Sequence, residues 1–209
     1  MVKGARASAD TIDLPLISEA LARVPPRIHA VDPERHASVA MIIEPGMDDY
    51  SVLFIERARK DSDPWSGQIA FPGGRREPED PDSRAVAVRE TAEEIGVLLK
   101  PSQYIGRLDD LKGRHGGTSE GMVISCFVYH LETPVEVTPN YEVAAVERLP
   151  IRHLVDSAHR TEIEWKDAEL RRFPGIRFGE NDARVVWGLT YRFLCAFFHR
   201  LGYCLPEDG

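Results

Sequence analysis

The chain has 209 residues, of which 43% are apolar, and a formal net charge of −8 at pH 7. This length and composition suit one soluble globular domain, which we assign to residues 1–209. The acidic balance argues against a general nucleic-acid binder, because phosphate backbones are held by concentrated basic surfaces. An acidic protein can still bind phosphate groups by placing divalent cations between its carboxylates and the substrate.

Two features of the sequence bear on the cell compartment. No stretch supplies the ~18 to 20 apolar residues needed to span a bilayer, and the first thirty residues contain no sustained apolar signal region. The odd number of cysteines, in apolar surroundings, suits reduced and buried thiols better than a disulfide framework: Cys126, Cys195 and Cys204. We therefore expect a cytoplasmic protein with no membrane partner.

The first third of the chain is predicted to contain one helix, several strands and turns. An N-terminal extension of residues 1–30 carries a short helix at 14–22, ended by two prolines. Strands are expected where β-branched and apolar residues cluster, at 37–43, 51–57 and 68–71. A glycine-rich turn at Gly73 and Gly74 and a polar loop follow.

A helix over residues 84–95 has clear signals at both ends. Asp82 or Ser83 can serve as its N-cap, and Gly96 is typical of a residue that ends a helix. Strands are predicted after it at 104–108, 121–131 and 143–149, with a glycine-rich loop at 113–121. Apolar residues spaced by three and four then indicate a C-terminal helix over 183–203. Mixed strands and helices indicate an α/β fold.

The helix over 84–95 carries three glutamates on one side. At ~100° per residue, Glu90, Glu93 and Glu94 fall within roughly a third of the circumference. The residues on the opposite side are expected to face the core: Ala85, Val88, Ala92 and Ile95. Carboxylates this close repel one another unless Arg89 or bound cations neutralise them, and Mg²⁺ prefers such oxygen ligands. At these spacings alone, a solvated acidic helix face is the commoner explanation.

The surrounding sequence changes that balance. Residues 74–97 resemble the Nudix box, which in words is a glycine, a glutamate six positions later, then Arg-Glu, two glutamates and a glycine. Here FPGG precedes the box and RETAEEIGV, residues 89–97, ends it. Two departures stand out: Asp80 replaces the first glutamate, and eight residues instead of seven separate it from Arg89. An aspartate-containing loop of this kind also occurs in Nudix enzymes that resemble coenzyme A pyrophosphatases.

The resemblance implies a fold, a reaction and a set of site residues. The fold would be the Nudix fold, an α/β/α sandwich with a mixed β-sheet. The reaction would be hydrolysis of a diphosphate bond with Mg²⁺, for which Mn²⁺ would substitute. Glu93 and Glu94 would be the principal metal ligands and Glu90 a further one, while Arg89 would orient a glutamate. Gly73 and Gly74 would form the turn that brings backbone close to the site.

Four residues outside this helix complete the expected site. Glu142 stands where Nudix proteins often place an extra acidic residue, as metal ligand or general base; an exposed loop glutamate without a role is the alternative. Arg57 resembles a phosphate-contacting arginine of the family, although an isolated arginine is more often an ion-pair partner. Trp65 would stack on an adenine or else fill core, and Arg75 would bind substrate beside the glycine turn.

Two further segments bear on the substrate. GQIAFPGG, residues 67–74, and VVWGLTYRFL, residues 185–194, resemble the coenzyme A subgroup, but Trp65 stands where that subgroup has a histidine. We therefore expect a small-molecule nucleotide partner, coenzyme A or a derivative, with an ADP-ribose or ADP-sugar pyrophosphatase as the alternative. A nucleotide-sensing domain without catalysis is a third interpretation, which the retained glutamates disfavour. The sequence leaves open whether the protein forms a homodimer.

Overall fold

The computed structural model describes residues 12–30, 32–59, 66–115, 118–166 and 170–206. Its helices are α1 (Leu14–Arg23), α2 (Ser83–Ile95), α3 (Ile151–Val155) and α4 (Gly188–Arg200). The strands of the larger sheet are β1 (His36–Pro45), β2 (Tyr50–Arg57), β3 (Ile69–Ala70), β4 (Gly73–Arg75), β5 (Tyr104–Arg107), β6 (Leu111–His115), β7 (Thr118–His130) and β8 (Val143–Pro150). A smaller sheet contains β9 (Arg160–Lys166), β10 (Leu170–Phe178) and β11 (Arg184–Trp187).

The larger sheet is mixed and forks along one edge of β1. β1 pairs in parallel with β7, while the other pairings are antiparallel. On its opposite edge, β1 pairs first with β4, up to Val39 opposite Gly73, and then with β2, from Ile42 opposite Leu53. Between the two, the amide of Ala40 donates to the carbonyl of Pro72 at 2.8 Å. The fork therefore places the glycine turn beside the middle of the sheet.

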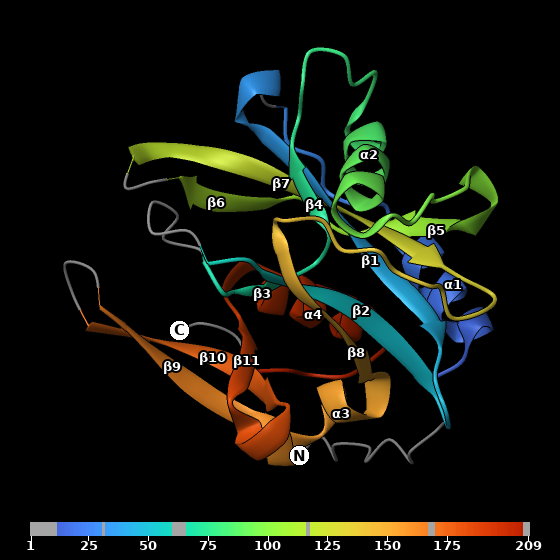
Figure 1. Cartoon of the computed structure of the whole chain (residues 1–209). Coiled ribbons are helices and arrows are strands. Elements are labelled where there is room, and N and C mark those ends of the chain that lie inside the picture. Colours follow the sequence, from blue (N-terminus) through green and yellow to red (C-terminus); the bar gives the residue numbers. More distant parts are fainter. Residues whose placement is uncertain (1–11, 31, 60–65, 116–117, 167–169, 207–209) are drawn as a thin grey trace, which may run out of the picture.

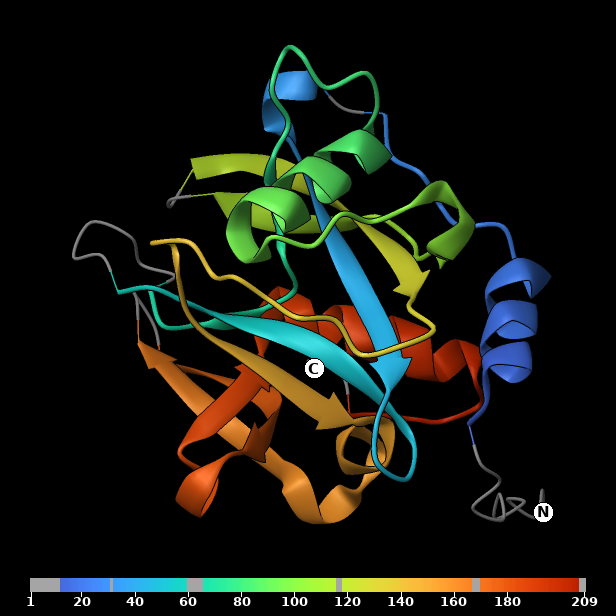
Figure 2. The same ribbon diagram turned by 45° about the vertical axis from the view of Figure 1, so that its right-hand side comes forward.

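Each face of this sheet is covered by a helix. Successive residues of a strand point to opposite faces, so neighbouring residues of β1 pack against different helices. Ala40 and Ile42 of β1 pack in one buried cluster with residues of α2, while Met41 and Ile43 pack in another with residues of α4. Figure 1 shows α2 (green) on one side of β1 and β2, with α4 (red) on the other, and Figure 2 shows the same layers after rotation. The predicted α/β/α sandwich with a mixed sheet is confirmed.

The predicted C-terminal helix begins later than expected. Residues 184–187 form strand β11, in which Val185 and Val186 lie opposite Arg177 and Ile176 of β10. β-branched residues pack well in a sheet, and Gly188 has a φ of 64° at the point where the strand gives way to α4. The apolar spacing that predicted a helix from residue 183 is therefore valid only from Gly188 onward.

The smaller sheet and one hairpin were not expected. β9 and β10 form an antiparallel pair where no element was predicted, although β9 alternates regularly between charged and uncharged residues; in β10 the pattern is interrupted by Pro174 and Gly175. Much of the expected glycine-rich loop at 113–121 belongs to β6 and β7, which pair with each other.

Cys126 and Cys195 are buried as expected, but Cys204 is exposed. In the part of the chain that the structure describes, no helix is long and apolar enough to cross a membrane.

Candidate active site

Helix α2 begins and ends where its local sequence signals place it. The side chain of Asp82 is the N-cap and accepts a hydrogen bond from the amide of Ala85 at 2.8 Å. Gly96 ends the helix in the left-handed conformation, with φ of 72°, and its amide donates to the carbonyl of Ala92 at 3.0 Å. Such caps satisfy backbone groups that a helix end leaves open. The start and end of the glutamate-bearing helix are therefore defined.

The expected division of α2 into a core face and a wet face is wrong for Glu94. This residue is only 3% exposed and its neighbours on the buried side of the helix are Ala87 and Thr91. Of the four residues expected to face the core, only Ile95 is fully buried; Ala85, Val88 and Ala92 are partly exposed. The reason is that α2 packs against β4, whose glycines let the helix come close on this side.

The glycine turn meets the helix through two carboxylates. The amide of Gly73 donates to Oε2 of Glu94 at 2.8 Å. A Cβ atom on Gly74 would overlap the carboxylate of Glu90, and one on Gly73, whose φ is 153°, would overlap the backbone of β1. The two glycines belong to strand β4 rather than to the expected turn, and the absence of side chains there allows the carboxylates of Glu90 and Glu94 to lie against main chain.

Arg89 holds the acidic side of the helix together. Its Nε and Nη2 atoms donate to the two carboxylate oxygens of Asp80 at 3.0 and 2.9 Å. Its Nη1 donates to Oε1 of Glu90 at 3.1 Å and to Oε2 of Glu93 at 3.0 Å, and its Nη2 also donates to the carbonyl of Arg75 at 3.0 Å. These contacts, chiefly the bonds to Asp80, raise the pKa of Arg89. The guanidinium thus contacts the carboxylates of two helix glutamates, Glu90 and Glu93.

Asp80 is the anchor of that arginine. It is 6% exposed, and its Oδ2 also accepts from the amide of Glu77 at 2.8 Å, which closes the loop before α2. The hydrogen bonds from Arg89 lower its pKa, so it stays ionised beside the guanidinium. The departure from the family glutamate thus keeps an acidic partner for Arg89, a contribution that the sequence analysis had not assigned.

The electrostatics of Glu94 set it apart from an ordinary surface glutamate. Burial raises its pKa to about 7, against the opposing effect of the hydrogen bond from Gly73. Repulsion from Glu90 and Glu142 raises the pKa further, while attraction by Arg57 lowers it. Burial also raises the pKa of Glu90. Carboxylates that are shielded from water and repel one another tend to bind either a proton or a cation.

Glu142 and Arg57, the two groups outside α2 whose charges affect the pKa of Glu94, come from a different part of the sheet. Arg57 ends β2 opposite Val143 of β8, and Glu142, which is half-buried, comes just before that strand. The amide of Ala58 donates to the carbonyl of Glu142 at 2.7 Å. Arg75 is exposed beside the glycine turn. Trp65, the expected stacking residue, lies outside the described residues.

The donor set fits a hard divalent cation. Glu90, Glu93 and Glu94 offer only carboxylate oxygens, which Mg²⁺ and Mn²⁺ prefer, and burial raises the pKa of Glu94 more than the bond from Gly73 and the attraction by Arg57 lower it. Among the described residues, no three potential ligands are already arranged around one point. Arg89 contacts two of the three glutamates in this arrangement, so these carboxylates are held near the site without forming a closed cage.

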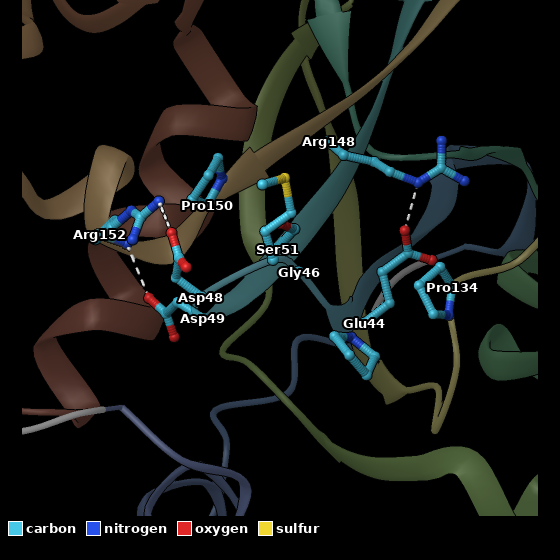
Figure 3. Close-up of a pocket in the computed structure, with 11 residues that line it drawn as sticks. Glu44, Gly46, Asp48, Asp49, Ser51, Pro134, Arg148, Pro150 and Arg152 are labelled. Atoms are coloured by element: carbon cyan, nitrogen blue, oxygen red, sulfur yellow. Dashed lines mark hydrogen bonds and ion pairs between the residues drawn. The ribbon is translucent and has the colours of Figure 1, made fainter.

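A cavity of about 570 Å³ lies elsewhere, around the turn between β1 and β2. Figure 3 shows Glu44 paired with Arg148 at one side of it; at the other, the guanidinium of Arg152 pairs with Asp48 and its backbone amide donates to Asp49. This is the opposite end of β2 from Arg57, a separation of about 20 Å at the usual rise per strand residue. The charged side chains that line the cavity pair with one another. Because of the separation, the cavity is not part of the carboxylate cluster.

Comparison with known proteins adds independent observations. A family model described as the NUDIX domain matches residues 34–172, more than half of the chain. An uncharacterized Schizosaccharomyces pombe protein is 32% identical over 77% of this chain and 54% of its own length. The Nudix hydrolase NudL of Photorhabdus laumondii is 28% identical over 79% of this chain and 84% of its own length.

Two further relatives extend the comparison. Nudix hydrolase 22 of Arabidopsis thaliana is 29% identical over 78% of this chain and 53% of its own length. The chain thus spans about half the length of the fission-yeast and plant relatives. Among solved structures, a MutT/nudix family protein from Enterococcus faecalis matches with a TM-score of 0.58 and 14% identity, covering 91% of this chain and 70% of that one. This last likeness concerns the fold alone.

Proposed function

Since this chain belongs to the Nudix family, we propose that it hydrolyses a diphosphate bond in a nucleoside-diphosphate-linked small molecule, with Mg²⁺ as its metal ion. The observation that carries the proposal is the state of Glu94. Its carboxylate is 3% exposed, bonded to the amide of Gly73 and repelled by neighbouring carboxylates. Burial of an ionised carboxylate costs free energy unless a cation binds to it. We propose that the bound cation also contacts the diphosphate group of the substrate.

The proposed metal ligands are Glu90, Glu93 and Glu94, with Mn²⁺ able to replace Mg²⁺. When bound, such an ion neutralises charge on phosphoryl oxygens and makes a water molecule more acidic. Arg89 contributes indirectly, because its contacts with Glu90 and Glu93 hold both carboxylates in place. Gly73 and Gly74 give the carboxylates room against the backbone.

The remaining site residues would bind substrate and accept a proton. In the reaction, a water oxygen bonds to one phosphorus, the P–O bond to the bridging oxygen breaks, and two phosphate monoesters result. Glu142 is the proposed acceptor of the water's proton, because it lies outside the helix that carries the three glutamates and is near enough to Glu94 to repel its carboxylate. Arg57 and Arg75 would bind phosphate oxygens, and Trp65 would stack on the base.

Coenzyme A or a derivative is the proposed substrate. The support comes from the segments GQIAFPGG and VVWGLTYRFL, which resemble the coenzyme A subgroup. Trp65 at the subgroup's histidine position makes ADP-ribose the first compound to compare with it. The two differ in the group attached to the diphosphate and in the 3′-phosphate that coenzyme A carries on its adenosine, so relative turnover separates them.

The test is direct. Purified protein is incubated with MgCl₂ and, separately, coenzyme A, ADP-ribose, NADH and a dinucleoside polyphosphate, and the products are separated by chromatography. We expect Mg²⁺-dependent release of adenosine 3′,5′-bisphosphate and 4′-phosphopantetheine from coenzyme A, and the loss of both products in Glu94→Gln. If no compound is cleaved, hydrolysis of these substrates is refuted. Binding of a nucleotide without turnover would instead support the nucleotide-sensing alternative.

A further inference from the structure

We propose that Asn140 is a positioning residue that holds Glu142 in place relative to Glu94 during diphosphate cleavage. The inference rests on the proposed function and adds a residue that belongs neither to the acidic helix nor to the glycine turn. Asn140 lies in the segment between β7 and β8, two positions before Glu142.

The first observation is the bond that Asn140 makes to Glu142. Oδ1 of Asn140 accepts a hydrogen bond from the amide of Glu142 at 2.7 Å. The carbonyl of Asn140 also accepts from the amide of Val143 at 3.2 Å, at the start of β8. An asparagine that bonds the backbone two residues ahead fixes the intervening turn. The backbone that carries the Glu142 side chain is therefore held on its N-terminal side by Asn140.

The second observation is that the same residue is tied to the helix of metal-binding glutamates. The amide of Asn140 donates to the carbonyl of Glu94 at 2.9 Å, and the amide of Thr138 donates to the carbonyl of Ile95 at 2.8 Å. These are carbonyls at the C-terminus of α2, which lack partners within the helix. Asn140 thus bonds to the backbone of Glu94 through its own amide and to the backbone of Glu142 through its side chain.

A third contact completes the connection to the sheet. The carbonyl of Glu142 accepts from the amide of Ala58, the residue that follows Arg57. The backbone of Glu142 is therefore held on one side by Asn140 and on the other by the end of β2. Removal of the Asn140 side chain would release only the first of these, so we expect Glu142 to move rather than the fold to fail.

The residue type fits the surroundings. Asparagine and aspartate both favour this kind of turn, because each has a side-chain oxygen that accepts the backbone bond. An aspartate at position 140 would add a further negative charge beside a cluster in which Glu90 and Glu142 already repel Glu94. Asparagine supplies the acceptor without that charge.

The experiment is a double-mutant cycle with Asn140→Ala and Glu142→Gln. It measures kcat and KM for coenzyme A and ADP-ribose with MgCl₂, using whichever the wild-type protein cleaves faster. We expect Asn140→Ala to lower kcat about 10-fold while KM changes less than about 2-fold, because small misplacements of a reacting group chiefly reduce turnover. The double variant should be no more than about 2-fold slower than Glu142→Gln alone, since the positioned group is then already lost.

Two additional variants exclude a purely structural role. Asn140→Ser keeps an oxygen that can accept from the backbone, so its kcat should lie between those of Asn140→Ala and the wild type. Asp156→Ala is the matched control: its Oδ1 accepts from the amide of Ala158, two residues ahead, at 2.9 Å, in an exposed turn outside the site. We expect kcat of this control to be unchanged.

The outcomes separate the inference from the proposed function. No turnover by the wild-type protein refutes the function and the inference with it. Turnover by the wild type with independent, multiplicative losses in the cycle refutes the inference alone, as does a kcat of Asn140→Ala within 2-fold of the wild type. A loss that disappears once kcat is corrected for the folded fraction, measured by thermal denaturation, would also overturn it.

Discussion

Two buried glutamates at opposite ends of the sheet are held in different ways. Glu44, at the end of β1, is fully buried; its carboxylate pairs with Arg148 and accepts from the amide of Val135 at 3.3 Å. Glu94 is almost as buried, but the donor that bonds to its carboxylate is the neutral amide of Gly73, and nearby carboxylates repel it. The first carboxylate contacts an arginine of its own chain, whereas the second is repelled by Glu90 and Glu142 and attracted by Arg57.

The difference separates a structural carboxylate from one suited to bind an exchangeable ion. A buried charge with a bonded partner tolerates burial, and removal of either partner is costly. A buried carboxylate in an acidic cluster gains most from a cation that comes from solution. Exposure alone would have ranked the two glutamates as equivalent, so the partners of a buried acid are the more informative observation.

The largest expected difference in kcat is between the glutamine variants of these two glutamates. We expect Glu94→Gln to lower Mg²⁺-dependent kcat by at least about 100-fold, because an amide oxygen is a poorer ligand than a carboxylate. The fold should persist, since the glutamine oxygen can still accept from Gly73. The measurement is kcat for the best substrate of the panel, with circular dichroism to verify folding.

Glu44→Gln is the counterpart. Its kcat should stay within about 2-fold of the wild type, while the free energy of unfolding falls by about 2 kcal/mol as Arg148 loses its charged partner. That figure is below the usual range for a broken buried pair because the Arg148 side chain is 33% exposed. Urea denaturation measures it. Equal losses of turnover in both variants would remove the distinction between the two ends of the sheet.

The next largest effect is expected at the arginine that joins the acidic residues. Arg89→Lys should lower kcat about 30-fold, because one ammonium group cannot replace the two-pronged contact with Asp80 and also bond Glu90 and Glu93. The control is Arg152→Lys, where an exposed arginine pairs with Asp48 at the other end of the sheet. We expect no change there. A lysine at position 89 with wild-type kcat would contradict the positioning role of Arg89.

A pH titration sharpens the comparison without a mutation at the site. With a pKa of about 7 in the metal-free protein, Glu94 binds a proton that Mg²⁺ must displace. The apparent affinity for Mg²⁺, measured by calorimetry, should therefore be about 10-fold weaker at pH 6 than at pH 8. Affinity independent of pH over this range would argue against Glu94 as a ligand.

The same pKa predicts how stability depends on pH when Mg²⁺ is absent. The raised pKa means that the folded state holds the proton more tightly than the unfolded state. This contribution is fully present below the ordinary value of 4.5 and is lost as the pH rises through about 7. It amounts to at most about 3 kcal/mol. Thermal denaturation of the wild type and Glu94→Gln at pH 5.5 and 8 should show the loss in the wild type alone.

The smallest expected effect is at the glycine turn. Gly74→Ala should lower kcat about 5-fold, because the new methyl group displaces the flexible carboxylate of Glu90 while the backbone stays in place. Gly121→Ala is the control, since a Cβ there would make an ordinary contact with the carbonyl of Gly113. A drop of similar size in both variants would indicate a general effect of replacing a strand glycine.

How much of this site was predictable from sequence depended on how local each signal was. The ends of α2 at Asp82 and Gly96 were predicted because caps are set by neighbouring residues. The burial of Glu94 was not predicted, because it depends on the orientation of α2 about its own axis where the helix packs against β4. That strand begins ten residues before the helix does. Arg89 was expected to orient a glutamate, but its partner Asp80 was recognised only as a departure from a pattern.

The fold shows the same dependence on range. Buried strands such as β1 and β2 have runs of apolar residues that predict them directly. In β10, Pro174 and Gly175 interrupt the strand pattern, and in β9 the regular alternation of charged residues with Thr161, Ile163 and Trp165 is a strand signal that was overlooked. In β11, apolar spacing suited a helix as well as a strand, and the partner strand β10 decided between them. Asn140 carried no sequence signal, since its role depends on the end of α2.

The short acid at position 80 has a consequence for how such sites diverge. A side chain shorter by one methylene, about 1.5 Å, still reaches the guanidinium of Arg89 in a loop that is one residue longer than the family pattern. Either change alone would alter the reach of the acid. Loop length and side-chain length are therefore expected to change together in related chains, as a compensated pair rather than as two independent substitutions.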